Sequence, residues 1–133
     1  MDSSTKTRIN CADYTIPLSA LDCAFDRFMQ IFYDNGIECM GIVHNRPKQG
    51  VSHCHIVTVP YLSQAEFKKI TGITYFFGGS MKTTIPDVVA YLLHCTDFYK
   101  FYGAEKYNLS EIKTNIDLSK YRNDFLKHEI NLR

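Results

Sequence analysis

Two histidines separated by a single residue, His53 and His55, are the most distinctive chemical feature of the sequence. Their segment predicts a strand, on which side chains two residues apart point to the same face, so the two imidazoles stand side by side. Two neutral imidazoles placed in this way can bind one divalent metal ion. Taken alone, the pair is explained more simply as two half-exposed strand histidines.

A third histidine strengthens the metal hypothesis. His44 lies nine residues before His53 (53 − 44), and a hairpin between their segments returns it beside the pair. Three convergent imidazoles predict an open metal site that acts as a Lewis acid on a carbonyl or phosphoryl oxygen. Glu38, which has the parity of His44, and Asn45, which follows it, are candidates for a further oxygen ligand. A solvated surface position is the simpler interpretation of Glu38.

A tyrosine is the second chemical feature. Helical spacing predicts a helix from Ile85 to about Cys95, and Tyr91 borders its apolar arc rather than lying within it. Such a tyrosine is normally packed by its ring, with its hydroxyl in water. Beside a metal ion that neutralises a phosphate, the same hydroxyl can act as a nucleophile, which an ordinary pKa near 10 otherwise makes weak at neutral pH. Tyr91 is therefore the candidate catalytic residue.

The elements that must position these residues follow from periodicity and capping signals. Alternating residues predict strands over 7–16, 37–44, 51–59 and 73–77. Capping boxes at Ser19–Asp22 and Ser63–Glu66 predict helices that end at Asn35 and Gly72. The order strand, helix, strand, strand, helix, strand predicts an α+β fold of the RRM-like or ferredoxin-like split βαβ type. In that fold an antiparallel sheet has helices on one face and the active site on the other.

The rest of the chain is expected to be less regular. Gly78 and Gly79 predict a turn before the helix at 85–95, and the segment 99–117 has no clear period. A last helix is predicted over 119–130. We expect Tyr121, Phe125 and Leu126 of that helix to turn inward.

Composition narrows the class of protein. The 133 residues are 45% apolar and 22% charged, which predicts a single globular domain over 1–133. The five cysteines are odd in number and form no CxxC pair, so we expect reduced thiols rather than disulfides. The chain has no apolar run long enough to span a membrane and no feature of a signal peptide, so we expect a cytoplasmic protein without a membrane partner. A net charge of +1 leaves any contact with nucleic acid to local clusters.

Taken together, these motifs resemble the HUH-type replication initiators (Rep) of small rolling-circle plasmids, over about residues 7–117. The segment His53-Cys-His55-Ile is similar to the metal-binding histidine motif of that family. Ala90-Tyr-Leu-Leu-His94, followed by Asp97, Lys100 and Tyr102, is similar to its tyrosine motif. His44 stands where the family has a histidine at the end of the preceding strand.

The resemblance implies an endonuclease domain that nicks single-stranded DNA in a replication-origin hairpin. His44, His53 and His55 would bind Mn²⁺ or Mg²⁺, and Tyr91 would attack a phosphodiester. The products would be a 5′-phosphotyrosine link and a free 3′-OH that primes rolling-circle replication, and the reaction can run backwards to rejoin strands. Family members often have an acidic ligand shortly after the first histidine, where this chain has Asn45 to Pro47. Many relatives also carry an oligomerisation or helicase region. The resemblance therefore leaves two possibilities: a minimal Rep, or the nuclease domain of a longer protein that forms an oligomer.

Local charges and rings predict the DNA contacts. The candidate residues flank the histidines or follow the tyrosine: Arg46, Lys48, His94, Lys100 and Tyr102. Other aromatic residues that can stack on unpaired bases are Tyr75, Phe76, Phe77, Tyr99 and Phe101. For Phe76 and Phe77, core packing is an equally good interpretation.

Two other functions fit the same sequence. The split βαβ order is also that of RNA-recognition domains, which bind nucleic acid without catalysis and have no need of His53, His55 or Tyr91. A metal-dependent phosphodiesterase that uses water would need the histidines but not Tyr91. Of these three functions, only the nickase forms a covalent bond between Tyr91 and DNA, so covalent capture distinguishes it from the other two.

Overall fold

Five strands and five α-helices make up the part of the chain that the computed structural model describes, residues 8–46 and 50–132. In chain order these are β1 (Ile9–Pro17), α1 (Phe25–Asp34), β2 (Cys39–His44), β3 (His53–Thr58), α2 (Gln64–Thr71), β4 (Phe77–Thr83), α3 (Ile85–Leu92), α4 (Asp97–Tyr102), β5 (Lys113–Thr114) and α5 (Arg122–Lys127). Three short 3-10 turns lie at Leu18–Ala20, Leu109–Glu111 and Ser119–Tyr121. No helix among these residues has the length and apolar character that crossing a bilayer requires.

The strands form one antiparallel sheet in the order β4-β1-β3-β2-β5. The predicted α+β class is confirmed, and so is the hairpin between β2 and β3. In that hairpin His44 is paired directly with His53. On the other side of β3, Thr15 of β1 is paired with His55. This register gathers the three histidines at one end of the adjacent strands β2 and β3.

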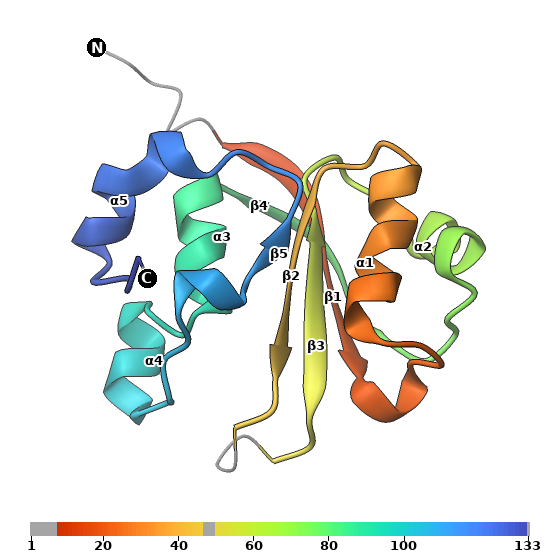
Figure 1. The fold of residues 1–133 in the computed structure, drawn as a ribbon, viewed down its shortest axis with the longest axis horizontal. Helices are drawn as coiled ribbons and strands as arrows, with labels where there is room; N and C mark the ends of the chain where they lie inside the picture. The colour runs from red at the N-terminus through yellow and green to blue at the C-terminus, as the bar shows by residue number, and fades with distance from the viewer. Residues whose placement is uncertain (1–7, 47–49, 133) are drawn as a thin grey trace.

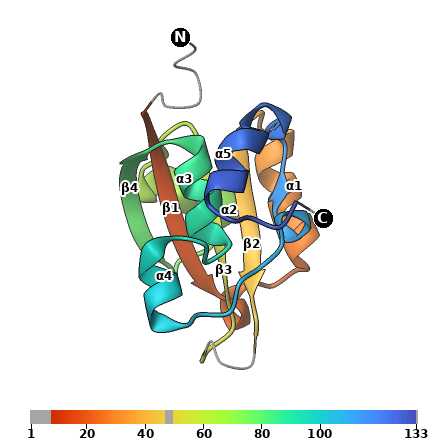
Figure 2. The same ribbon diagram turned by 90° about the vertical axis from the view of Figure 1, so that its left-hand side faces the viewer.

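Helices cover both faces of the sheet, rather than one face as predicted. Figure 1 shows α1 and α2 on one side of the sheet and α3, α4 and α5 on the other. Turned by 90°, Figure 2 shows α3, α4 and α5 in front of the sheet. Large core residues between the sheet and α1 or α2 include Tyr14, Phe28, Phe32, Ile56 and Phe67. Those on the opposite side include Val57, Val88, Leu92, Tyr107 and Phe125.

The physical reason lies in the strands, whose two faces are both apolar over most of their length. Cys11 and Met40 belong to the core under α3, whereas Ala12 and Cys39, one residue away, belong to the core under α1. A sheet that is apolar on both faces needs cover on both. The histidine end of β2 and β3 is where polar side chains replace this apolar pattern.

The first helix begins later than predicted. α1 starts at Phe25 with Ala24 at its N-cap, and no side chain caps it. Residues 18–20 instead form a separate 3-10 turn, and the backbone N–H of Leu18 donates to the carbonyl of Ser52 at 3.1 Å. This tertiary bond holds the segment against the β2–β3 connection, so the predicted box at Ser19–Asp22 does not form. The box at Ser63 and Glu66, by contrast, is confirmed in full.

The fourth strand also lies later in the chain. β4 runs from 77 to 83, and the two glycines predicted to form a turn, Gly78 and Gly79, lie inside it. Gly78 has a φ of +133°, and a Cβ atom there would overlap the carbonyl oxygen of Asp13 on β1. A glycine that permits close approach of two strands looks like a turn residue in the sequence.

The later helices differ in extent from the prediction. α3 ends at Leu92 rather than Cys95, because His94 adopts a φ of +60°. The segment expected to be irregular contains α4 and β5. Near the C-terminus, Phe125 is buried as predicted, but Leu126 is 53% exposed, because successive residues of a helix point about 100° apart.

Candidate metal and nucleophile site

His44, His53 and His55 form a compact cluster on the α3 side of the sheet. One ring nitrogen from each lies within 4.8 Å of the other two. The ring centroids are 4.8 Å apart for His44 and His55 and 5.1 Å apart for His53 and His55. His44 and His55 are buried, and His53 is half-buried at the edge. The sequence-predicted triad is therefore brought together by the hairpin register.

Two of the three imidazoles place one nitrogen at a backbone carbonyl. Nε2 of His44 lies 2.7 Å from the carbonyl oxygen of Leu92. Nδ1 of His53 lies 2.9 Å from the carbonyl oxygen of Val51. Because a carbonyl only accepts, the ring hydrogens are assigned to these nitrogens. The remaining nitrogens, Nδ1 of His44 and Nε2 of His53, then face each other at 3.3 Å with a lone pair each.

The third imidazole is held in the same way by side chains of β1. Nδ1 of His55 lies 3.3 Å from a carboxylate oxygen of Asp13 and 3.1 Å from the hydroxyl oxygen of Thr15. Because a carboxylate only accepts, the contact with Asp13 assigns the ring hydrogen to Nδ1 and leaves Nε2 with its lone pair. An oxygen partner on the non-ligating nitrogen is typical of metal-binding histidines.

The donor set fits a metal ion. Two lone pairs that face each other at 3.3 Å repel unless a cation lies between them. Two nitrogens bound to one metal ion at about 2.0–2.1 Å, as in zinc–histidine sites, are separated by about 2.9–3.4 Å. The spacing of the two nitrogens on His44 and His53 falls within that range. The cluster can therefore hold a metal ion.

The protonation of His44 favours the same conclusion. Burial lowers the pKa of His44 to about 3, and the neighbouring histidines lower it further, against the opposing effect of the bond to Leu92. The ring is therefore neutral at physiological pH, which is the form that binds metals.

Tyr91 lies beside this cluster, in the last turn of α3. Thr84 caps the start of the helix by accepting from the backbone N–H of Asp87, and Pro86 occupies its first turn as predicted. The Tyr91 ring centroid is 5.6 Å from that of His55. Burial, and then the nearby charge of Asp13, raises the pKa of Tyr91. The hydroxyl is therefore protonated in the resting protein.

Asp13 is a site residue that the sequence interpretation missed. Its carboxylate accepts from the Tyr91 hydroxyl at 3.1 Å through one oxygen and contacts His55 through the other. The available signal was a single charged residue within the apolar strand segment 9–17. Period-two spacing also puts Asp13 on the same face of β1 as Thr15. Only the pairing of β1 with β3 shows that this face meets His55.

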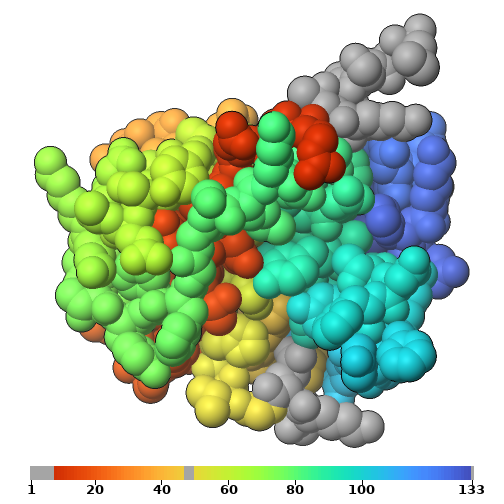
Figure 3. Space-filling model, turned by 180° about the vertical axis from the view of Figure 1, so that it is seen from behind, coloured from red at the N-terminus to blue at the C-terminus, as the bar shows by residue number. Residues whose placement is uncertain are grey.

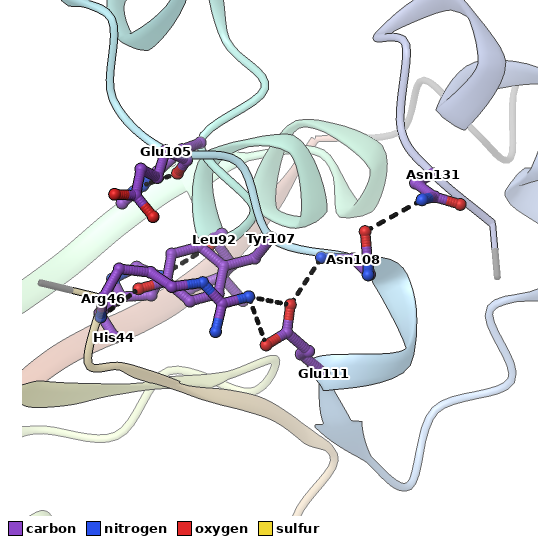
Figure 4. Close-up of polar contacts among 9 residues, drawn as sticks. His44, Arg46, Leu92, Glu105, Tyr107, Asn108, Glu111 and Asn131 are labelled. Atoms are coloured by element: carbon purple, nitrogen blue, oxygen red, sulfur yellow. Dashed lines mark hydrogen bonds and ion pairs between the residues drawn. The ribbon is translucent and has the colours of Figure 1, made fainter.

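Arg46 contacts two residues of the same chain, Glu111 and Tyr107. One guanidinium nitrogen, Nη2, donates to both carboxylate oxygens of Glu111 at 2.8 and 2.9 Å, and the guanidinium carbon lies 4.3 Å from the centre of the Tyr107 ring. Tyr107 in turn packs 4.7 Å from the ring of His44 (Figure 4). The ring of Tyr107 therefore contacts both Arg46 and His44. Arg46 was predicted to contact DNA, and in this structure its side chain is partly exposed and contacts Glu111 and Tyr107.

His94, which was also predicted to contact DNA, is buried. It is only 4% exposed, and its Nδ1 lies 2.9 Å from the carbonyl oxygen of Glu105. The ring packs between His44 and Tyr99, with centroids 4.4 and 4.3 Å away. The positive φ that ends α3 turns this side chain inward, where it supports His44.

The other predicted DNA-contacting residues have different positions. Lys100 lies on α4 with its ammonium 3.4 Å from the carboxylate of Glu129. Tyr102 is 68% exposed on the same helix. Lys48 lies outside the described residues.

Neither candidate for an additional metal ligand faces the cluster. Glu38 is exposed at the beginning of β2, about 20 Å from His44 at the strand's other end. Asn45 lines a hollow near the β5 edge of the sheet, with Phe25, Val43 and Glu111 among its neighbours. Within the described part of the chain, the ligands gathered around the site are the three histidines.

An exposed aromatic pair lies on the same face of the sheet. Phe77 of β4 is paired with Thr15, which is paired with His55, so the three form one row across the strands. Phe77 is 57% exposed, and its ring contacts that of Tyr75 at 5.4 Å. Phe76, in contrast, packs against Tyr14 in the core.

The sequence matches no protein-family profile, and a comparison with curated proteins gives no match. The resemblance to the HUH-type initiators therefore rests on the motifs quoted above.

Proposed function

We propose that this protein is a metal-dependent nickase and strand transferase of single-stranded DNA, with Tyr91 as its nucleophile. One observation carries the proposal. The Tyr91 hydroxyl and the three-histidine cluster are joined by a single carboxylate, that of Asp13, so a nucleophile and a metal site meet at one point. A structural tyrosine and three structural histidines have no need of this arrangement.

The metal ion proposed for the cluster is Mn²⁺ rather than Mg²⁺. Mg²⁺ prefers oxygen ligands, whereas the three gathered ligands are imidazole nitrogens. His44, His53 and His55 would hold the ion. When bound, it would neutralise charge on a phosphodiester and make the phosphorus a better electrophile.

The reaction conserves the number of phosphodiester bonds. The Tyr91 oxygen forms a bond to phosphorus, and the bond between phosphorus and the 3′ oxygen breaks. Tyr91 loses one proton, and the departing 3′ oxygen gains one, which leaves a free 3′-OH and a 5′-phosphotyrosine. Since no oxidant or nucleotide is consumed, the reverse reaction rejoins the strand. These products suit the initiation of rolling-circle replication in the cytoplasm, at an origin hairpin that exposes single-stranded DNA.

Aromatic residues on two sides of the cluster would bind the unpaired bases. Phe77 and Tyr75 lie on the β4 side, and the exposed rings of Phe101 and Tyr102 lie on α4. Figure 3 shows the β3 segment (yellow) at the surface next to the segment of α3 and α4 (teal to cyan). Stacking on aromatic rings is tolerant of sequence and supplies affinity for single strands.

A water-using phosphodiesterase is the second candidate. The raised pKa of Tyr91 favours it, because a hydroxyl that resists ionisation is a slower nucleophile. In this case the histidines keep their role, water attacks the phosphorus, and no covalent adduct forms.

Covalent capture tests the proposal. The full chain is incubated with Mn²⁺ and a pool of randomised single-stranded oligonucleotides, and adducts are resolved on a denaturing gel. We expect an adduct with the wild type and none with Tyr91→Phe, whereas Tyr33→Phe, on α1 at the opposite face, keeps it. Cleavage without an adduct would support the water-using phosphodiesterase. Binding without cleavage would support a binding module of the RNA-recognition type.

A further inference from the structure

We propose that Asp13 is a positioning residue that couples the metal site to the nucleophile. One carboxylate oxygen holds the imidazole of His55, and the other holds the hydroxyl of Tyr91. The inference deepens the proposed function, on which the role of Tyr91 as nucleophile rests. The expected effect of Asp13 on metal binding, through the orientation of His55, does not depend on whether the protein cleaves DNA.

The placement of Asp13 is unusual for a charged residue. It lies on β1, a central strand of the sheet, and its side chain is only 19% exposed. Among the described residues, its ion-pair partner is His55 and neither lysine nor arginine. Burying most of a carboxylate is costly unless hydrogen bonds compensate, and both of its oxygens make such contacts.

The chemistry of a carboxylate sets the orientation of both neighbours. An ionised carboxylate only accepts hydrogen bonds, so His55 must donate from Nδ1 and Tyr91 must donate from its hydroxyl. The first bond leaves Nε2 of His55 free for a metal ion. The second fixes the direction of the hydroxyl and leaves the oxygen lone pairs facing away from Asp13. Metal ligation and nucleophile geometry therefore depend on one side chain.

An asparagine at this position cannot serve both neighbours. With its oxygen toward His55, its NH₂ faces Tyr91 and reverses the direction of that hydrogen bond. With its oxygen toward Tyr91, its NH₂ faces the N–H of His55, and the two donors repel. Asp13→Asn keeps the size of the side chain but breaks one of the two contacts in either orientation.

Thr15 is the competing explanation for the orientation of His55, since its hydroxyl lies 3.1 Å from the same nitrogen. A hydroxyl can both donate and accept, so Thr15 alone does not select the tautomer of His55. Thr15→Val therefore tests which β1 residue orients the ring.

Metal affinity is the first measurement. The full chain is titrated with Mn²⁺ and the free ion is followed by its electron paramagnetic resonance signal. We expect Asp13→Asn to weaken Mn²⁺ binding by about 10- to 100-fold, the usual effect of losing a partner of a metal-binding histidine. Asp34→Asn, the same chemical change at the exposed end of α1, should leave the affinity unchanged. Unchanged affinity in Asp13→Asn, or a loss confined to Thr15→Val, overturns the proposal.

Adduct formation is the second measurement. At saturating Mn²⁺ and oligonucleotide, we expect Asp13→Asn to lower the single-turnover rate by at least about 10-fold while the Kd for DNA stays within about 2-fold. A wild-type rate in Asp13→Asn contradicts the coupling. If the wild type forms no adduct, the proposed function fails, and the Mn²⁺ titration still decides whether Asp13 orients His55.

The wild type supplies a third measurement, in which a variant serves only to assign one signal. Tyrosine labelled with ¹³C at Cζ is followed by NMR during titration with Zn²⁺, and Tyr91→Phe identifies the Tyr91 signal. We expect that signal to shift as the metal binds, because Asp13 links the hydroxyl to His55. A Tyr91 signal that does not move while Zn²⁺ binds overturns the coupling.

Discussion

The imidazole of His44 connects the histidine cluster to the tyrosine helix, because its Nε2 donates a hydrogen bond of 2.7 Å to the carbonyl of Leu92, the residue after Tyr91. The carbonyl belongs to the last turn of α3, where backbone oxygens have no helical partner. This bond therefore satisfies the Leu92 carbonyl and fixes the tautomer of His44.

Removing one ligand tests the metal site directly. We expect His53→Ala to weaken Mn²⁺ binding by at least about 100-fold, because loss of a ligand costs more than loss of its hydrogen-bond partner. His53 is half-buried at the edge, so its truncation leaves the core intact. His128→Ala, which removes a partly exposed histidine that pairs with Asp87 and lies outside the cluster, is the matched control. Equal Mn²⁺ affinities in the two variants would contradict the assignment.

Acid should destabilise the metal-free protein. The folded pKa of His44 is about 3, below its ordinary value of 6.5, so the unfolded chain binds more protons between these values. The free energy of unfolding therefore falls as the pH drops below about 6.5, by at most about 1.4 kcal/mol per pH unit for this residue. Burial also lowers the pKa of His94, which acts in the same direction. Urea unfolding at pH 7 and 5.5 measures the slope, which should be smaller in His44→Gln.

The two glycines of β4 should respond very differently to a methyl group. A Cβ at Gly78 would overlap the backbone of Asp13 at a φ of +133°, whereas nothing lies within 4 Å of one at Gly79. We expect Gly78→Ala to lower the free energy of unfolding by more than about 2 kcal/mol and Gly79→Ala by less than about 1 kcal/mol. Urea denaturation compares them. Similar stabilities would mean that β1 and β4 are not in close contact.

Phe77 offers a test of where single-stranded DNA binds. Its ring is exposed in the row that leads to His55, and stacking of a base on an aromatic ring contributes about 1–3 kcal/mol. We expect Phe77→Ala to weaken binding of single-stranded DNA by about 5- to 150-fold without changing Mn²⁺ affinity. Fluorescence anisotropy with a labelled oligonucleotide measures the Kd. An unchanged Kd would remove Phe77 from the binding surface.

Thiol reactivity tests the packing of the sheet. Burial raises the pKa of Cys39 and Cys54 to about 12 and that of Cys11 to about 11, and Cys95 is also buried. The thiolate is the reactive form, so these four should resist a disulfide reagent in the folded protein. Cys23, which is half-buried, should react first. We expect one fast thiol in buffer and five in denaturant, and several fast thiols in buffer would contradict the packing.

Local signals in the sequence predicted the elements that carry the site. Alternation placed His53 and His55 on one face of a strand, and the loop before them implied a hairpin that returns His44. Thr84 and Pro86 marked the start of the helix that carries Tyr91. These predictions succeeded because period, caps and short loops depend on residues close together in the chain.

Errors arose where a distant segment decides the local conformation. Gly78 lies within a strand, where the carbonyl of Asp13 leaves no room for a Cβ atom. In the sequence, the same glycine predicted a turn. The bond from Leu18 to Ser52 prevented a capping box whose residues were present. The β1–β3 pairing brought Asp13 to His55, and no spacing in the sequence indicates that partnership.

The sequence by itself determined that three imidazoles and a tyrosine lie on elements able to present them, because residue type and period are local properties. The tertiary structure decided which ring nitrogen of each histidine is free, that a carboxylate joins His55 to Tyr91, and that His94 supports the site from inside. These features depend on distances between strands and helices that pack together only when the sheet is complete, so they follow from register and burial rather than from any segment of the chain.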